Sequence, residues 1–186
     1  MSEDIRRARD LDLLDAIDAL KREAFSGSVW RVVRDGRDPI LGSASKSRWC
    51  NGSFDALYTS LDRNGAIAEI HALLSLQPVF PSQSKWFAHK LQISASQTLR
   101  LADLASLDRL GVDTARYVDR EYGRTQDIAD AAYFLGFDGL IVPSARWDCL
   151  NAVLFTDRLA PDQIEAAESN SDSIDWDHWR KQKRSS

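Results

Sequence analysis

One carboxylate stands apart in the sequence and could do chemistry. Glu69 is the only residue with a formal charge between Asn64 and Ser84. An ionised carboxylate moved away from water is strongly destabilised unless it is paired, so a helix that keeps one usually pairs it, neutralises it or uses it. No basic residue lies within one helical turn of Glu69. Any counter-charge must therefore come from another part of the fold.

Two arginines could share a pocket with Glu69. Arg31 lies inside the apolar stretch 29–33. It is either a core arginine whose head finds a carboxylate or an anion-binding group, because the planar guanidinium fits a phosphate bidentately. Arg48 lies beside Trp49, and the simplest interpretation of that pair is stacking on the indole at a loop surface.

Polar residues at the ends of predicted strands are further candidates. Tyr58 is either a core ring with a satisfied hydroxyl or a flat surface for an aromatic ligand such as nicotinamide. Ser144 follows a strand and a proline, where it is either a turn serine or part of a functional loop. It lacks the flanking glycines of a nucleophile elbow. Asn151 could simply satisfy backbone groups, and His71 fits a core histidine on the apolar stripe of its helix.

Composition limits the class of protein. Of the 186 residues, 44% are hydrophobic and 28% are charged, which is typical of a folded globular domain. The net charge of −4 argues against direct nucleic-acid binding, which normally needs a basic surplus. Two cysteines and three histidines without metal-ligand spacing predict free thiols and no metal. No signal peptide or membrane span is apparent, so we expect a cytoplasmic protein with no membrane association.

The hydrophobic pattern predicts one domain with two appended segments. Apolar residues recur at helical spacing before Ser26 and Gly27, which predicts an N-terminal amphipathic helix over 1–26. The segment 27–160 mixes strands and helices without regular alternation, which favours an α+β fold with mixed central sheets. The remainder, 161–186, is expected to hold a helix and a charged tail. We expect this tail to be solvated, although Trp176 and Trp179 could dock onto the body or a partner.

Local signals place the elements that would carry the candidate residues. A helix capped by Asn64 and stopped by Pro78 would carry Glu69. Short strands are expected at 29–33, 56–59, 87–93, 99–101, 140–142 and 152–155. Further helices are expected at 103–110, closed by Gly111, and at 126–135, capped by Thr125. The polar segment 35–47 should be a loop.

The joint order of these residues resembles the RES domain family, which is named for an arginine, a glutamate and a serine in this order. The resemblance covers residues 27–159 and is most specific from Gln126 to Ser144. It implies that 27–160 is an NAD-binding catalytic domain similar to ADP-ribosyltransferase toxins. Lys46, Ser47 and Cys50 depart from the glycines and the polar residue that many relatives have around the second arginine.

The resemblance implies a role for each matching residue. Arg31, Glu69 and Ser144 would be the three naming residues, with Arg48 and Tyr58 as the second arginine and the tyrosine of the pocket. Glu69, Arg31 and Tyr58 are then expected to be catalytic. The expected NAD contacts are Arg31, Arg48, Tyr58, Ser144 and Asn151. NAD would be consumed as a substrate, with Glu69 stabilising the positive charge that develops on the ribose when nicotinamide leaves.

The implied function is that of a toxin in a bacterial toxin–antitoxin pair, held inactive by an Xre-like antitoxin. ADP-ribose would go to a side chain of a host protein or, alternatively, to water or phosphate, which would deplete NAD directly. The sequence does not choose between these acceptors. A non-catalytic binding module is a different class, and a nuclease is disfavoured by the acidic composition. The segment 172–186 is a further candidate for contact with a partner.

Overall fold

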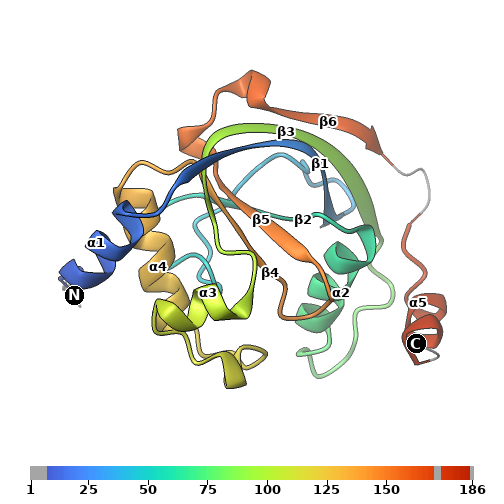
Figure 1. Ribbon diagram of the computed structural model, residues 1–186. Helices are drawn as coiled ribbons and strands as arrows, with labels where there is room; N and C mark the ends of the chain where they lie inside the picture. The colour runs from blue at the N-terminus through green and yellow to red at the C-terminus, as the bar shows by residue number, and fades with distance from the viewer. Residues whose placement is uncertain (1–7, 170–172, 185–186) are drawn as a thin grey trace, which may run out of the picture.

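The computed structural model describes residues 8–169 and 173–184 (Figure 1). Its helices are α1 (Leu11–Asp18), α2 (Arg63–Leu74), α3 (Leu104–Arg109), α4 (Gly123–Phe134) and α5 (Trp176–Arg184). Its strands are β1 (Arg22–Arg34), β2 (Ala56–Ser60), β3 (Trp86–Arg100), β4 (Gly139–Pro143), β5 (Leu150–Phe155) and β6 (Ile164–Ser169). Short 3₁₀ turns at Thr114–Arg116, Thr156–Arg158 and Pro161–Gln163 complete the described elements.

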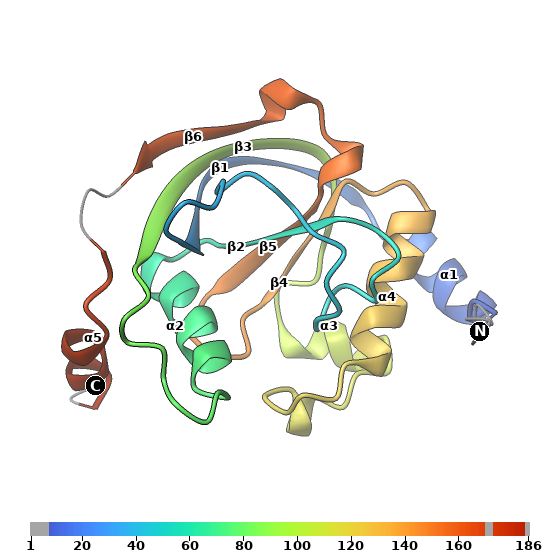
Figure 2. The same ribbon diagram turned by 180° about the vertical axis from the view of Figure 1, so that it is seen from behind.

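The described strands form one mixed sheet that curls on itself. The strand order is β1-β2-β5-β4-β3-β6, and β1 also pairs with β3 along most of its length. The pairing of β3 with β4 is parallel and the other pairings are antiparallel. The long strands β1 and β3 arch over the shorter strands β2, β5 and β4 (Figures 1 and 2). The expected α+β fold with a mixed sheet is therefore confirmed.

Side chains pack on both sides of the curled sheet. Val29, Leu91, Ile141 and Leu154 belong to a cluster contributed by the strands themselves. The opposite face of β2, β5 and β4 packs against α1, α3 and α4. At the other end of the molecule, α2 and α5 form a third cluster with residues of β1 and β3 (Figure 2). This arrangement leaves α2 facing the ends of β4 and β5.

The expected N-terminal helix over 1–26 is too long. The helix spans Leu11–Asp18, and β1 begins at Arg22, so Ser26 and Gly27 lie within a strand. Residues 1–7 lie outside the described part of the chain. Residues from Arg22 onward form a strand because their backbone groups pair with β3, which lies far away in the sequence. The periodicity of apolar residues does not reveal this pairing. Residues 86–100 likewise form one continuous strand, where two short strands were expected.

Two predicted helix caps are wrong by a few residues. The side chain that caps α2 is that of Asp62, which accepts the Gly65 backbone N–H, rather than that of Asn64. Helix α4 begins at Gly123, and the Thr125 hydroxyl donates to the Tyr122 carbonyl inside its first turn. The expected helix before Gly111 is confirmed, with Asp103 as its cap.

The C-terminal segment is docked on the body, so the expectation of a solvated tail is wrong. Trp176 and Trp179 of α5 are 5% and 6% exposed. They pack around His71 of α2, with ring centroids 5.9 and 4.9 Å away. A predicted C-terminal helix is confirmed, but strand β6 was not expected. Burial of two indoles is strongly stabilising, which explains why a segment of high charge still packs.

Candidate active site

Glu69 lies in the middle of α2, and a glycine one turn earlier sets how closely this helix approaches the sheet. A Cβ at Gly65 would lie 2.5 Å from both Cys149 Sγ and Ser60 Oγ. Only a hydrogen fits there, so the first turn of α2 lies directly against the end of β2 and the loop between β4 and β5. Residues four apart share a helix face. Glu69 is therefore directed toward the same loop.

Two neutral donors hold the Glu69 carboxylate. The Ser144 hydroxyl donates to Glu69 Oε1 over 2.7 Å. The Asn151 side-chain amide donates to the same oxygen over 3.0 Å. Ser144 follows β4 directly and Asn151 lies in β5, opposite Val142 of β4. The register of two neighbouring strands thus brings both donors to one oxygen of the helix.

Ser144 is a turn serine and a Glu69 partner at once. Its Oγ accepts the backbone N–H groups of Arg146 at 3.1 Å and of Trp147 at 3.3 Å. Because both of these bonds use the oxygen as an acceptor, the single hydroxyl hydrogen is left for Glu69. The turn therefore fixes the direction of the donor.

The charge of Glu69 has no cationic partner within the described residues, since none of their ion pairs includes it. Three titratable groups feel its charge, namely Tyr58, Tyr117 and Cys149. Burial, reinforced by Glu69, raises the pKa of each of them above its ordinary value. All three are therefore neutral near pH 7, and the described partners of the carboxylate are the two hydrogen-bond donors Ser144 and Asn151.

Tyr58 of β2 borders the same site, but its hydroxyl is already used. It accepts from the Ser47 hydroxyl at 2.7 Å and from the Trp49 backbone N–H at 2.6 Å. These contacts fasten the loop before β2 to the sheet. The Gln126 side chain of α4 supports the same loop by donating to the carbonyls of Ser47 and Cys50. The geometry agrees with a partly buried ring whose polar end is satisfied.

Arg48 does not stack on its neighbour Trp49, so that expectation is wrong. Trp49 is 1% exposed and belongs to the core. The Arg48 guanidinium instead lies over the rings of Tyr117 and Tyr122, at 4.7 and 4.8 Å from their centroids. It also donates to the Asp119 carbonyl. Burial raises the pKa of Tyr117; the Arg48 charge opposes this increase and the Glu69 charge adds to it, so both charges act on the same ring.

Arg31 is engaged elsewhere. Its Nη1 donates to the carbonyls of Pro39 at 2.9 Å and Leu41 at 2.7 Å, in the loop between β1 and β2. Burial lowers the pKa of Arg31 to about 10, and Asp38 opposes this shift. The structure thus brings Ser144 and Asn151 into contact with Glu69, and Tyr58 and Arg48 lie at the border of this site. The described hydrogen bonds of Arg31 are to the loop between β1 and β2.

Some members of the site were missed from the sequence. Tyr117 and Tyr122 lie in a charged segment with no clear helical or strand pattern, and Gly65 lies in a helix where glycine is unfavourable. The glycine was the one available signal, because a glycine inside a helix often marks a close approach. The Tyr117 hydroxyl donates to the Pro143 carbonyl at 2.7 Å, directly before Ser144.

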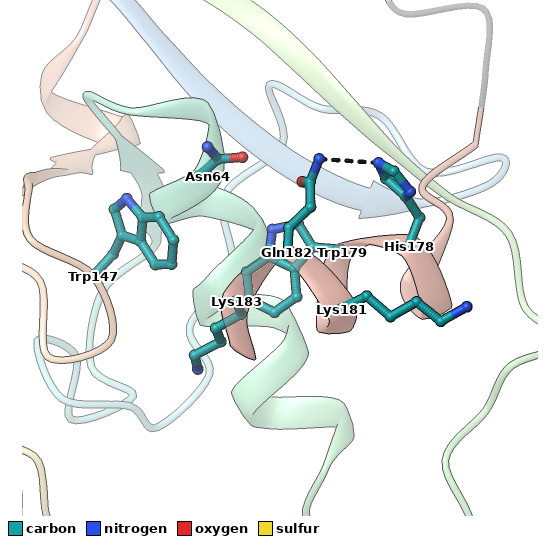
Figure 3. A pocket seen from close by; sticks show the side chains of 7 residues that line it. All are labelled: Asn64, Trp147, His178, Trp179, Lys181, Gln182 and Lys183. Atoms are coloured by element: carbon teal, nitrogen blue, oxygen red, sulfur yellow. Dashed lines mark hydrogen bonds between the residues drawn. The ribbon is translucent and has the colours of Figure 1, made fainter. Parts of the chain in front are cut away.

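Two cavities adjoin the turn at Ser144. One of about 520 Å³ is lined by Tyr117, Pro143, Ser144, Trp147 and other residues of the surrounding loops. The other, also about 520 Å³, lies between Trp147, Asn64 of α2 and the side chains of α5 (Figure 3). Trp147 and Trp179 lie 6.1 Å apart between ring centroids. The C-terminal helix therefore contacts the loop that holds Ser144.

Two further properties bear on the chemistry. No group of His, Cys, Asp and Glu side chains within residues 8–169 and 173–184 is arranged to hold a metal ion. No helix in these ranges is long and apolar enough to cross a membrane. Cys50 and Cys149 are both free thiols, and burial raises the pKa of each.

Comparison with known proteins finds a matching family and a solved structure with a similar fold. The RES domain matches residues 28–177 of the chain. Among solved structures, the chain is similar to one described as the crystal structure of the M. tuberculosis MbcT–MbcA toxin–antitoxin complex. The TM-score is 0.81 at 19% identity, covering 94% of this chain and 98% of that one. At this identity the likeness shows a shared fold. No match was found among curated protein sequences.

Proposed function

The chain belongs to the RES domain family, and from this premise we propose that it is the toxin of a toxin–antitoxin pair that consumes NAD. It would cleave the bond between nicotinamide and ribose and transfer the ADP-ribose to a host protein. The solved structure with the same fold is described as a toxin–antitoxin complex, which supports a protein antitoxin as partner. The Xre-like character of that antitoxin is part of the proposal.

The observation that carries the proposal is the state of Glu69. Its carboxylate is fixed by two neutral donors on Oε1 and forms no ion pair with a described residue. A carboxylate paired with an arginine would have its charge largely offset. Here the charge is available to a cation that forms in the site, and a preorganised charge gains most when the opposite charge develops in the transition state.

The chemistry requires little beyond this group. When the bond between ribose C1′ and the nicotinamide nitrogen breaks, its electron pair leaves with nicotinamide and the ribose becomes oxocarbenium-like. Glu69 would stabilise that cation, and its free Oε2 would accept hydrogen bonds from ribose hydroxyls. A nucleophile on a protein side chain, or water or phosphate, then forms the new bond to C1′ and loses a proton.

We assign the phosphate contact to Arg48, because its guanidinium lies at the border of the site on two tyrosine rings. The ring of Tyr58 is proposed to contact nicotinamide, and Ser144 to act beside the reacting centre. Arg31 is proposed to order the loop between β1 and β2, whose carbonyls it holds.

The test is incubation of the purified protein with NAD labelled in its adenylate part, together with a cell extract. Release of nicotinamide with label on a protein supports transfer to a host protein. Label confined to small molecules instead supports NAD degradation. The folded Glu69→Gln protein serves as the blank. If the wild-type protein releases no more nicotinamide than this blank, both transfer to a host protein and NAD degradation are refuted.

A further inference from the structure

We propose that Asn151 is a positioning residue for Glu69: its amide holds one carboxylate oxygen so that the other oxygen faces the ribose. The inference rests on the proposed function of Glu69. It gives Asn151 a role that acts through the carboxylate, in place of direct contact with NAD.

The surroundings of Asn151 favour a role that acts through Glu69. The residue lies within β5, in register with Ser60 of β2 on one side and Val142 of β4 on the other. It is only 5% exposed. Its Nδ2 is bonded to Glu69, and its Oδ1 is buried without a partner. A ligand would have to displace Glu69 to bond to Nδ2, and the buried Oδ1 is not open to solvent.

The orientation of the amide follows from its partner. A flipped amide would place the Asn151 carbonyl oxygen against the Glu69 carboxylate, where two acceptors repel each other. The observed orientation leaves a buried Oδ1 unsatisfied, which destabilises the fold. In this orientation the Asn151 Nδ2 donates a hydrogen bond to Glu69, and this is the hydrogen bond that the structure describes for the side-chain amide.

Both donors meet at the same oxygen, and this asymmetry defines the role. Ser144 and Asn151 bond to Oε1, and Oε2 accepts no hydrogen bond from the described residues. One oxygen is therefore anchored by β5 and by the turn after β4, while the other is left without a hydrogen bond from the described residues. Charge-assisted bonds of this kind are short and strong, so they fix the orientation of the carboxylate.

The groups that face Glu69 do not replace a lost donor. They are Tyr58 from β2, Tyr117 from the segment after α3 and Cys149 from the loop before β5, all neutral near pH 7. The Arg48 guanidinium lies over the Tyr117 ring and forms no ion pair with Glu69. Removing the Asn151 amide should therefore leave Glu69 Oε1 held by Ser144 alone, so that the carboxylate is less well fixed.

The experiment observes the Glu69 carboxylate directly at a fixed neutral pH and then measures the kinetics. The protein is labelled with ¹³C-carboxyl glutamate, and the Glu69 signal is identified by its absence in Glu69→Gln. Asn151→Leu keeps the side-chain shape but removes the donor. We expect the Glu69 carboxyl chemical shift to change in this variant, because one of its two donors is lost. We also expect kcat for nicotinamide release to fall about tenfold with KM nearly unchanged, since the loss of one hydrogen bond to a charged group has about that effect.

A second variant and a control separate this effect from lost stability. Asn151→Asp keeps the size of the side chain but places a second carboxyl group where the amide donor was, so kcat should fall at least as far as in Asn151→Leu. Thr59→Val removes another buried hydrogen bond between β2 and β5, from the Thr59 hydroxyl to the Ala152 carbonyl, and should leave both the Glu69 chemical shift and kcat unchanged.

The outcomes are distinct. Equal Glu69 chemical shifts in the wild-type and Asn151→Leu proteins would overturn the inference, and so would an unchanged kcat in an active protein. A change of the same size in Thr59→Val would also overturn it, because the effect would then be a general consequence of loosening the sheet. Absence of nicotinamide release in the wild-type protein would refute the proposed function, and is read independently of the chemical shift.

Discussion

Replacing Glu69 by glutamine is expected to lower the rate of nicotinamide release about a thousandfold while the fold survives. The magnitude follows from the charge that is removed. A unit negative charge at about 4 Å from a developing positive charge, in an effective dielectric of about 20, contributes about 4 kcal/mol. Each 1.4 kcal/mol or so changes a rate by about a factor of ten, so the loss is about three orders of magnitude.

The structure explains why this substitution should spare stability. A glutamine side chain keeps an acceptor oxygen for the hydrogen bonds from Ser144 and Asn151. It also breaks no ion pair, since Glu69 forms none with a described residue. The free energy of unfolding should therefore change by less than about 1 kcal/mol, which urea titration measures.

The assay is nicotinamide release at saturating NAD, quantified by chromatography, for the wild-type, Glu69→Gln and Glu121→Gln proteins. Glu121 carries the same charge, but its side chain is 70% exposed and pairs with Arg116, so its replacement should leave the rate unchanged. A Glu69→Gln rate within tenfold of wild type would refute the electrostatic role of the carboxylate. A large loss of stability would refute the account of how it is held.

Three further outcomes are expected. Gly65→Ala places a methyl group 2.5 Å from two packed side-chain atoms, so it should lower the free energy of unfolding by about 1–3 kcal/mol and also reduce nicotinamide release. Gly123→Ala, with open space around it, should be neutral or stabilising, and urea titration compares the two variants. The pKa of His71 is lowered by burial and by the cations of α5, so the folded protein binds fewer protons at His71 than the unfolded chain does. The free energy of unfolding should therefore fall as the pH drops from about 7 to about 5. His71→Phe should flatten this dependence, and equal slopes in the wild-type and variant proteins would contradict the argument. Trp179→Ala should cost about 3–5 kcal/mol of stability in thermal or urea unfolding, against less than about 0.5 for the exposed Val79→Ala; similar losses would mean that α5 is not docked in solution.

Some features of the site were visible in the chain alone. Glu69 is conspicuous because no other formal charge lies within a turn, and the same isolation appears in the structure as the lack of an ion pair. Ser144 was identified from its place after a strand and a proline. Both depend on local sequence context, which a one-dimensional pattern records well.

Other features required the folded chain. The partners of Arg48 are rings about 70 residues away in sequence, and the sequence instead suggested its neighbour Trp49. The charged C-terminal segment looked solvated because its charges are local, whereas the surface that buries its two indoles is formed by α2. The acceptors of Arg31 also required the folded chain, since they are loop carbonyls whose positions no periodicity encodes.

The sequence by itself determined the residue types, the α+β character, the family resemblance and most helix and strand positions, because these depend on interactions among near neighbours. Only the tertiary structure decided that Ser144 and Asn151, 75 and 82 residues from Glu69, share one of its oxygens. That meeting depends on the register of β4 with β5 and on how closely Gly65 lets α2 approach them. Both are set by packing between distant segments, which is the part of folding that local sequence leaves open.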